Sequence, residues 1–587
     1  YPLEETITSF KSIIYGWRPE SLILISGSYI FKSLTPESDI DMIVLLPNYE
    51  KINEINLQYI NNLIKIHCII YLEGGIRYPL QFKIVWFEIL LMEGVSSLFK
   101  VGGRVPLLKL QYYGYDFDLL FVGVPCHIPL RKEYKENLNL EDTDKIINQI
   151  IFNLKTEPIK DIRSVILPLS DTDKLINQII FNLKMGPIED IRSIILPLSG
   201  YRANLYIANL IEKNLEIFRT LLFVLKIWAK KHFIYSGQFG FFNGTNLSVM
   251  ACKTILLNKR NSQQSIVHLL EQFYKTFTKW NWKNPVLIDR QQLAQQSNNS
   301  LNEHNDQIRI KNLLDWNINS DFTKRRQVFG LDNYTVYNQN IRRLEDHAKL
   351  MWPIIAPGNP PQNSGFNINY STSKILLTEM RLASESLKYI QSVIKYYINK
   401  KRKSRKGKTI IKNTWINWLD GGPFEEKYEH FMAITSMNLN SNNQIFEEFN
   451  NFVETRIRLG LVFNIENISE IDYCHAKPGR VWNNEECPSI IMKNNIIKEK
   501  INGEKDVNND NTSTNLLCTT WIVGIKMKST TRLPSLIFIS SSNHFEEFTN
   551  RIKQKYFLPE EERENIQLLA SYWSKNQLKL ELKNKQK

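Results

Sequence analysis

Short apolar runs separated by turns fill the first 125 residues and predict a small β-sheet. The runs at 22–25 and 42–46 consist of Leu, Ile, Val and Met alone, a pattern typical of strands that are buried on both faces. Two more runs, at 82–87 and 118–122, predict further strands of the same sheet. The chain therefore opens with an α/β or α+β domain.

Helical spacing replaces this pattern at 203–290, where the stretch 217–231 is amphipathic and ends in lysines. A proline-rich hinge at 352–362 marks a boundary, and a helix is expected at 372–398. Beyond it the pattern is mixed, with strands expected near 428–436, 458–464 and 519–528. Polar segments that interrupt these elements predict a loop at 291–345, an insert at 494–515 and a frayed Lys-rich tail from 574.

A tandem repeat lies between the two patterns. Residues 142–170 recur as 171–199, with 24 of 29 positions identical. Apolar residues in the first copy follow helical spacing, and Asp142 or Thr143 is expected to cap that helix. Near-identity indicates a recent duplication, so we expect one copy to be an additional surface element rather than a functional one.

Composition narrows the class of protein. The 587 residues carry a net charge of +14, which is typical of a protein with an anionic partner, whether nucleic acid, nucleotide or an anionic membrane surface. A merely basic surface explains the charge equally well. No apolar run reaches the ~18 residues that span a bilayer, so no membrane is expected. Six dispersed cysteines without CxxC or zinc spacing indicate a reducing compartment. The chain begins with Tyr1, as expected of part of a longer product.

The first candidate chemistry lies at the predicted turn and strand around residue 40. Gly27 and Ser28 follow a predicted strand, and Asp39 and Asp41 begin the next one. Residues i and i+2 of a strand point to the same side, so the two carboxylates lie together and need a cation between them. Mg²⁺ prefers such oxygen ligands, and the Gly-Ser turn can hold a phosphate beside it. Taken alone, an acidic strand end is the more common explanation.

A second acidic pair precedes the run at 118–122. Asp116 and Asp118 share one face of the predicted strand, and Asp118 fits the start of the apolar run better, although spacing does not decide between them. A third carboxylate would complete a two-metal site, in which one ion activates an attacking hydroxyl and the other neutralises the leaving group.

These motifs resemble those of the DNA polymerase β nucleotidyltransferase superfamily, and within it eukaryotic nuclear poly(A) polymerases. Seven segments match in the family's order, at 26–47, 105–121, 217–251, 277–287, 351–373, 428–436 and 519–527. The resemblance implies an α+β multidomain fold with a palm-like nucleotidyltransferase domain, a helical central domain and a C-terminal RRM-like domain. The implied nucleotidyltransferase domain is 1–130, which is N-terminally short, and an insert with the duplication follows at 131–199. The implied helical central domain is 200–352. The implied RRM-like domain is 353–587, with inserts at 400–412 and 488–515.

The resemblance also implies roles for single residues. Asp39, Asp41 and Asp118 match the family's catalytic metal ligands, for Mg²⁺ or alternatively Mn²⁺. The residues that match its ATP contacts are Gly27, Ser28, Thr35, Lys226, Tyr235, Gly244 and Thr245. Without the resemblance, Lys226 would be taken for a solvated helix lysine. Three positions near the base in the family differ here, namely Ser26 for Phe, Ser199 for Asn and Thr245 for Val.

The implied activity is template-independent addition of AMP from ATP to RNA 3′ ends, in the nucleus, by a monomer working with cleavage and polyadenylation factors. The alternatives are another terminal transferase of the superfamily and a catalytically weak RNA-binding paralogue. The basic run at 400–408 is a nuclear import signal, a solvated charge run or a nonspecific RNA contact, and the sequence leaves these alternatives open. The tryptophan pairs at 280/282 and 415/418 are expected in the core.

Overall fold

The computed structural model describes most of the chain. The described residues are 2–17, 19–35, 38–47, 93–101, 107–124, 138–156, 189–258, 265–282, 285–288, 352–358, 362–399, 405–439, 443–492, 516–528, 534–556, 563 and 565–585. Among them, no helix is long and apolar enough to cross a membrane. The expected strand at 82–87 and the segments at 291–345 and 494–515 lie outside these residues.

A five-stranded sheet forms the N-terminal part in the order β1-β2-β5-β4-β3. The strands are β1 (Leu22–Ile25), β2 (Ile40–Pro47), β3 (Val95–Val101), β4 (Leu107–Tyr112) and β5 (Tyr115–Val124). Strands β2 and β5 are parallel, and the other pairs are antiparallel. Three predicted strands, at 22–25, 42–46 and 118–122, are thereby confirmed.

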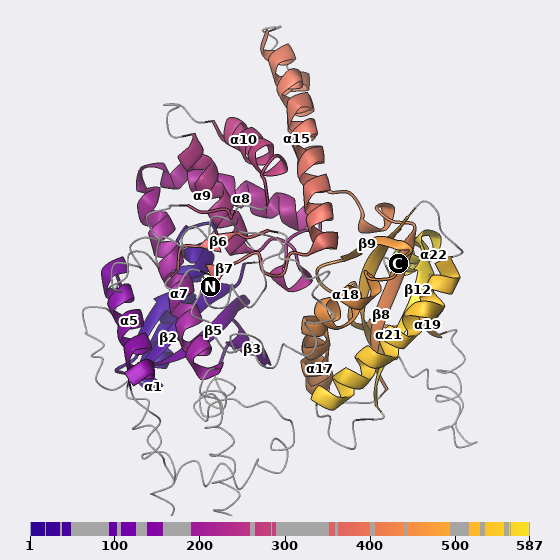
Figure 1. Cartoon of the computed structure of the whole chain (residues 1–587), viewed down its shortest axis with the longest axis horizontal. Helices are drawn as coiled ribbons and strands as arrows, with labels where there is room; N and C mark the ends of the chain where they lie inside the picture. The colour runs from indigo at the N-terminus through magenta and orange to yellow at the C-terminus, as the bar shows by residue number, and fades with distance from the viewer. Residues whose placement is uncertain are drawn as a thin grey trace, which may run out of the picture.

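Helices cover both faces of this sheet (Figure 1). On one face, α1 (Leu3–Trp17) buries Phe10 against Phe117, with ring centroids 5.2 Å apart. On the other, α5 (Leu140–Thr156) and α7 (Glu189–Leu210) pack against alternate strand residues. Because successive strand side chains point to opposite faces, the all-apolar runs of β2 and β5 serve both cores.

The first repeat copy contributes to this core. Thr143 and Ile147 of α5 are fully buried, and Arg202 of α7 donates to Asp144 at 2.8 and 2.9 Å. The described part of the first copy, residues 142–156, therefore packs against the sheet and is not an external addition to it. The predicted cap is also wrong, because the Asp142 amide donates to Asn139, which caps the helix one turn earlier.

The helical middle of the chain packs around aromatic side chains. Its helices are α8 (Leu215–Lys231), α9 (Gly244–Leu257) and α10 (Ile266–Thr278), with short turns η4 (Glu212–Asn214) and η5 (Gly237–Phe239). Trp282 stacks on Trp352 with centroids 3.8 Å apart, and Trp418 is buried, so the tryptophans belong to the core as predicted. The two-stranded pair β6 (Ile355–Ala356) and β7 (Gln362–Asn363) follows.

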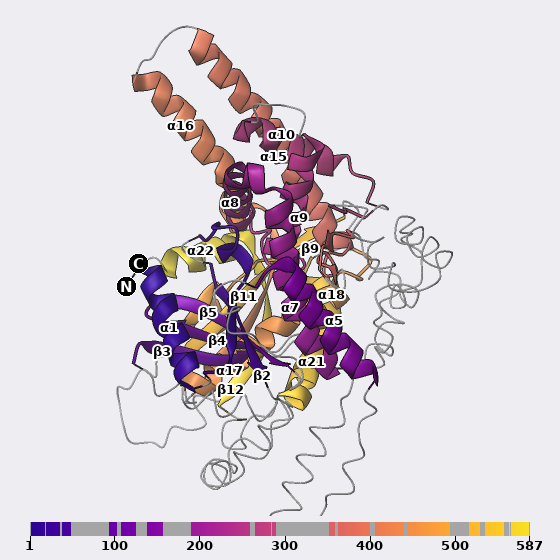
Figure 2. The same cartoon turned by 90° about the vertical axis from the view of Figure 1, so that its left-hand side faces the viewer.

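Two long helices then form an antiparallel hairpin (Figure 2). They are α15 (Tyr370–Asn399) and α16 (Arg405–Leu419). Figure 2 shows that the tip of this hairpin, made by the end of α15 and the start of α16, extends well beyond the other described elements. Its base packs against α10 and the C-terminal sheet.

The C-terminal part is an antiparallel sheet in the order β10-β11-β8-β12, with β9 also paired to β11. The strands are β8 (His430–Asn438), β9 (Ile471–Ala476), β10 (Trp482–Glu486), β11 (Leu517–Met527) and β12 (Ile566–Ser574). The helices and turns around it are η6 (Phe424–Glu426), α17 (Asn443–Arg456), η7 (Ile457–Val462), α18 (Phe463–Ile465), α19 (Ser489–Met492), α21 (Pro534–Lys555) and α22 (Lys575–Lys585). The strands expected near 428–436 and 519–528 are confirmed as β8 and β11.

Two expectations for this part are wrong. Residues 458–464 form helical turns rather than a strand, because a short apolar run fits either structure and here it fills a helical core position. The tail does not fray but forms α22, in which Leu578 and Glu581 are buried. The Glu581 carboxylate accepts hydrogen bonds from the backbone and hydroxyl of Ser489 at 3.0 and 2.6 Å.

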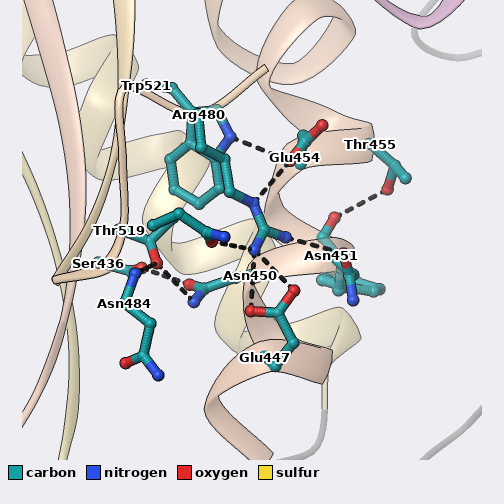
Figure 3. A network of polar contacts seen from close by, with 12 residues as sticks. Ser436, Glu447, Asn450, Asn451, Glu454, Thr455, Arg480, Asn484, Thr519 and Trp521 are labelled. Carbon is teal, nitrogen blue, oxygen red and sulfur yellow. Dashed lines mark hydrogen bonds and ion pairs between the residues drawn. The ribbon is translucent and has the colours of Figure 1, made fainter. Parts of the chain in front are cut away.

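Arg480 joins α17 to this sheet (Figure 3). Its guanidinium donates to Glu454 at 3.0 Å, to Glu447 at 2.6 Å and to Asn451 at 2.8 Å. The Trp521 indole of β11 donates to the same Glu454 carboxylate. These bidentate and charge-assisted contacts hold α17 against the sheet and give Arg480 a structural role.

Candidate active site

Two acidic residues meet on the parallel strands of the first sheet. Asp41 of β2 and Asp118 of β5 are direct partners in the strand register, and Asp39 immediately precedes β2. Asp116 instead lies opposite Gln111, whose amide donates to it at 3.4 Å. The structure thus brings Asp118 rather than Asp116 beside Asp41, a choice that spacing alone left open.

The charge of this acidic group is incompletely balanced. Burial, together with the charge of Asp39, raises the pKa of Asp41 to about 6. Burial raises the pKa of Asp118 to about 7, with Asp39 and Asp41 adding to the effect. Buried Oδ1 of Asp118 has no hydrogen-bond partner among the described residues. A buried carboxylate oxygen without a donor is the kind of atom that a cation would satisfy.

The ammonium of Lys109 balances part of the negative charge of these acidic residues. Its ammonium lies 3.2 Å from Asp39 Oδ2 and 3.8 Å from Asp118 Oδ1, and Lys109 is the register partner of Asp118 on β4. Among the described residues, no three acidic, His or Cys side chains form a ready-made metal cluster. The Lys109 ammonium thus lies next to two of the three predicted metal ligands. The motif search missed Lys109, although alternation in β4 places it on the face opposite buried Leu108 and Leu110.

The turn before the acidic strand closes over Asp41. Gly27 has a φ of +62°, and a Cβ added there would lie 1.9 Å from Asp41 Oδ2. The Ser26 amide donates to the Asp41 carbonyl at 2.8 Å, which fixes the turn against β2. Only glycine allows both this backbone conformation and this close approach.

Ser28 and Thr35 lie in the same connection. The Ser28 carbonyl accepts from the Ser33 amide at 2.9 Å. The Thr35 amide donates to Ser38 Oγ at 2.8 Å, and Lys230 Nζ donates to Thr35 Oγ1 at 3.3 Å. The connection between β1 and β2 thus contacts helix α8 directly through Thr35.

Helix α8 (Leu215–Lys231) and the turn after it face the acidic residues from the other side of the site. Lys226 is buried, and its Nζ donates to the Ser33 carbonyl at 3.4 Å. Burial and the nearby charge of Lys230 lower the pKa of Lys226 to about 8, although Asp41 acts in the opposite direction. Burial, followed by Asp41 and Asp39, raises the pKa of Tyr235 to about 12. Lys226 and Tyr235 therefore face the acidic group. Lys230, one helical turn after Lys226, joins them but was missed, although its i+4 spacing was readable.

Gly244 and Thr245 begin α9 beside Tyr235. A Cβ on Gly244 would lie 3.4 Å from Tyr235 Oη. Asn243 caps the helix, accepting from the Asn246 amide at 2.8 Å. The predicted contact residues from three separate stretches of sequence are thus drawn together.

Two of the three positions that differ from the family are buried, and one of them, Ser26, lies in the turn against Asp41. Ser26 and Ser199 are 7% and 1% exposed. The Asn204 amide of α7 donates to Ser26 Oγ at 3.3 Å, so an amide does reach the turn from this helix, although not from position 199. Asn204 carried no signal in the sequence.

The C-terminal part holds the turn between Lys230 and Tyr235. Phe233 has a φ of +61°, rare for a bulky residue. His475 of β9 donates through Nε2 to the Phe233 carbonyl at 2.8 Å, and the Tyr428 hydroxyl donates to Nδ1 at 2.7 Å. Burial lowers the pKa of His475 to about 4, which keeps this tautomer neutral.

A second contact fixes the same turn. Glu379 of α15 lies 2.6 Å from His232 Nδ1 and accepts from Lys427 Nζ at 2.7 Å. Burial alone would raise the pKa of Glu379, but these two partners lower it to about 2. The end of α8 and the turn after it are therefore anchored by residues more than a hundred positions further along the chain.

Comparison with known proteins gives two domain matches. Residues 217–320 match the poly(A) polymerase central domain, and residues 423–586 match the poly(A) polymerase predicted RNA binding domain. Poly(A) polymerase PAPalpha of Candida albicans is 24% identical over 63% of this chain and 47% of its own length. Nuclear poly(A) polymerase 4 of Arabidopsis thaliana is 21% identical over 78% of this chain and 44% of its own. The chain spans about half the length of these relatives.

Solved structures show only distant likeness. A Cid1 poly(U) polymerase mutant bound to MgATP is 13% identical, with a TM-score of 0.33 over 66% of this chain and 87% of that one. Terminal uridylyl transferase 4 of Trypanosoma brucei is 11% identical, with a TM-score of 0.35 over 66% of this chain and 93% of that one.

The fold class expected from the sequence, a multidomain α+β protein with helical central and C-terminal RNA-binding domains, is confirmed. Within that class, residues 217–320 and 423–586 are similar to the central and predicted RNA binding domains of poly(A) polymerases, as the sequence motifs predicted.

Proposed function

We propose that this protein is a template-independent polynucleotide adenylyltransferase that adds AMP from ATP to RNA 3′ ends. The observation that carries the proposal is the convergence of Asp41 and Asp118 on adjacent parallel strands, faced by Lys226 and Tyr235 of the central helices. Acidic residues on one wall and cationic residues on the other suit a nucleoside triphosphate whose phosphates lie between them.

The donor set fits divalent cations. Asp118 Oδ1 lacks a hydrogen-bond donor among the described residues, and Gly27 leaves Asp41 Oδ2 room that any other residue would fill. Asp39, Asp41 and Asp118 would hold Mg²⁺, or alternatively Mn²⁺. Bound there, a pair of ions would lower the pKa of the RNA 3′-hydroxyl and neutralise the departing pyrophosphate.

The protein's own groups position the triphosphate. Lys226 and Lys230 provide cationic donors for its phosphate oxygens, and Tyr235 offers a hydroxyl whose raised pKa keeps it protonated and able to donate. Ser28 and Thr35 contribute hydroxyls from the turn. Gly244 and Thr245 approach from α9, where the absence of a side chain at Gly244 leaves room beside Tyr235.

The reaction requires no covalent enzyme intermediate. The RNA 3′-oxygen forms a bond to the α-phosphorus of ATP while the bond from that phosphorus to the bridging oxygen of pyrophosphate breaks. The hydroxyl proton passes to solvent. Positioning and charge neutralisation supply the catalysis.

A nucleotide-incorporation assay on an oligo(A) primer, run separately with ATP, GTP, CTP and UTP, tests the proposal. Preferential addition of AMP supports it. Preferential addition of UMP would indicate another terminal transferase, and RNA binding without extension would indicate a catalytically inactive relative. Nuclear location and partnership with processing factors form part of the proposal, since one relative is named as nuclear.

A further inference from the structure

The exposed face of α15 carries a repeated pair of residues. A cationic residue followed by a large apolar one occurs at 381–382, 388–389 and 395–396, which is Arg-Leu, Lys-Tyr and Lys-Tyr at intervals of seven. Leu382, Tyr389 and Tyr396 are 51%, 65% and 52% exposed. We call these six residues the α15 stripe.

Helix geometry places the stripe along one side of the hairpin. Seven residues make almost two turns and advance about 10.5 Å, so each type of residue forms a line parallel to the axis. The opposite side of α15 is the packed one, where Ala383, Leu387 and Ile390 are buried. Gln391 also contacts Glu271 of α10 from that side. The fold therefore does not need the stripe to be apolar.

Cations are concentrated in the same hairpin. Helices α15 and α16 contain eight Lys and Arg residues against two Glu. One of those glutamates, Glu379, is buried and paired with Lys427, so it does not offset the exposed charge. Four more cations lie in the sequence between the two helices, at 400–403. The hairpin thus carries much of the chain's net charge of +14.

We propose that the α15 stripe binds single-stranded RNA upstream of the 3′ end that is extended. This inference rests on the proposed function only in taking RNA as the anionic polymer that is bound. Tyr389 and Tyr396 offer aromatic faces on which bases stack whatever their sequence. Arg381, Lys388 and Lys395 neutralise the backbone phosphates beside them. Such a surface retains the growing product without reading it.

A helical protein partner is the competing occupant. A seven-residue period also suits an amphipathic helix with acidic flanks. Two observations favour RNA. First, two of the three apolar residues are tyrosines rather than aliphatic residues. Second, the hairpin carries more cations than are needed to align a partner helix on three apolar contacts. The experiment below separates the two.

Binding of a fluorescently labelled oligo(A) to the full chain, at several salt concentrations, tests the stripe. Each of Tyr389→Ala and Tyr396→Ala should weaken binding of a long oligo(A) by about fivefold or more. The double variant Lys388→Gln/Lys395→Gln should lower the slope of log affinity against log salt by about 1.4. The matched double variant Lys553→Gln/Lys555→Gln, on the exposed end of α21, should leave both quantities unchanged.

The same variants are assayed for AMP addition to a short primer, which reaches only the acidic site. Unchanged addition to the short primer, with weakened binding of the long oligo(A), supports the stripe. Failure of the unmodified chain to extend any primer would contradict the proposed function and leave the binding result intact. Long-RNA affinity that is unaffected by the stripe variants would overturn the inference, as would stripe-dependent binding of an acidic helical peptide but not of RNA.

Discussion

Asp41 and Asp118 lie directly opposite each other in the parallel pairing of β2 and β5, although 77 positions separate them in the chain. The pairing places two carboxylates on adjacent strands in surroundings that raise the pKa of both groups. Such an arrangement is unfavourable for the fold alone, because like charges close together in a buried site repel each other. A cation bound between them, as proposed above, would remove this repulsion.

Gly27→Ala should abolish nucleotide addition without unfolding the protein. The added methyl would overlap Asp41 Oδ2 at 1.9 Å and occupy a backbone conformation with φ of +62°. Gly114→Ala is the matched control, because Gly114 has a φ of +81° but no atom within 4 Å of an added Cβ. Initial rates and thermal unfolding of both variants provide the test. Equal loss of activity in the two would assign the effect to backbone strain and not to contact with Asp41.

Lys109→Ala should make the stability of the protein depend on divalent metal. Removal of the ammonium leaves Asp39 and Asp118 without their nearest cation, at a cost of about 1 kcal/mol at this partly exposed position. Thermal unfolding is compared in EDTA and in Mg²⁺, with Lys145→Ala, which removes an exposed pair with Glu141, as control. We expect Mg²⁺ to stabilise Lys109→Ala more than either the unmodified chain or Lys145→Ala. Equal stabilisation of all three would contradict this role for Lys109.

Acid should destabilise the contact between His475 and the Phe233 turn. Burial lowers the pKa of His475 from 6.5 to about 4, so its stabilising contribution is present above pH 6.5 and is lost as pH falls through about 4. The loss amounts to at most about 3 kcal/mol. Unfolding midpoints measured across this window should fall less steeply for His475→Gln than for the unmodified chain. Tyr428→Phe keeps the imidazole and should retain the steep dependence, and parallel curves for all three proteins would refute the assignment.

Deletion of residues 142–170 should give a folded, active protein. The second repeat copy then supplies Asp173, Leu175 and Ile176 in place of the acidic and apolar residues that α5 buries. Asp173→Ala should destabilise the deletion variant by about 2 kcal/mol through loss of the pair with Arg202, but should be silent in the full chain. A deletion variant that fails to fold would show that the two copies are not interchangeable.

Much of the site could be predicted from sequence because it depends on local order. Asp39, Asp41 and Asp118 sit next to apolar runs whose strand character is unambiguous, and short strands in one sheet bring such ends together. Strand alternation and i+4 spacing indicate the faces on which Lys109 and Lys230 lie, but their partners are on other elements, and Asn204 has no sequence signal at all.

The incorrect expectations also arise because the structure depends on contacts between residues far apart in the sequence. The run at 458–464 is too short for its period to separate strand from helix, so its helical conformation depends on packing. The tail from 574 looked polar, but Glu581 is held by Ser489 across 92 positions. The link from His475 to Phe233 spans 242 positions and involves a strained backbone that no local pattern announces.

The most direct measurement is AMP incorporation from ATP into an oligo(A) primer by the unmodified chain and by Asp41→Asn, Asp118→Asn and Asp116→Asn, with RNA affinity measured in parallel. We expect Asp41→Asn and Asp118→Asn to lose incorporation while binding RNA as tightly as the unmodified protein, and Asp116→Asn to retain most activity. Measurable primer extension by a folded Asp41→Asn variant would contradict the assignment of the Asp41–Asp118 pair as the catalytic metal site.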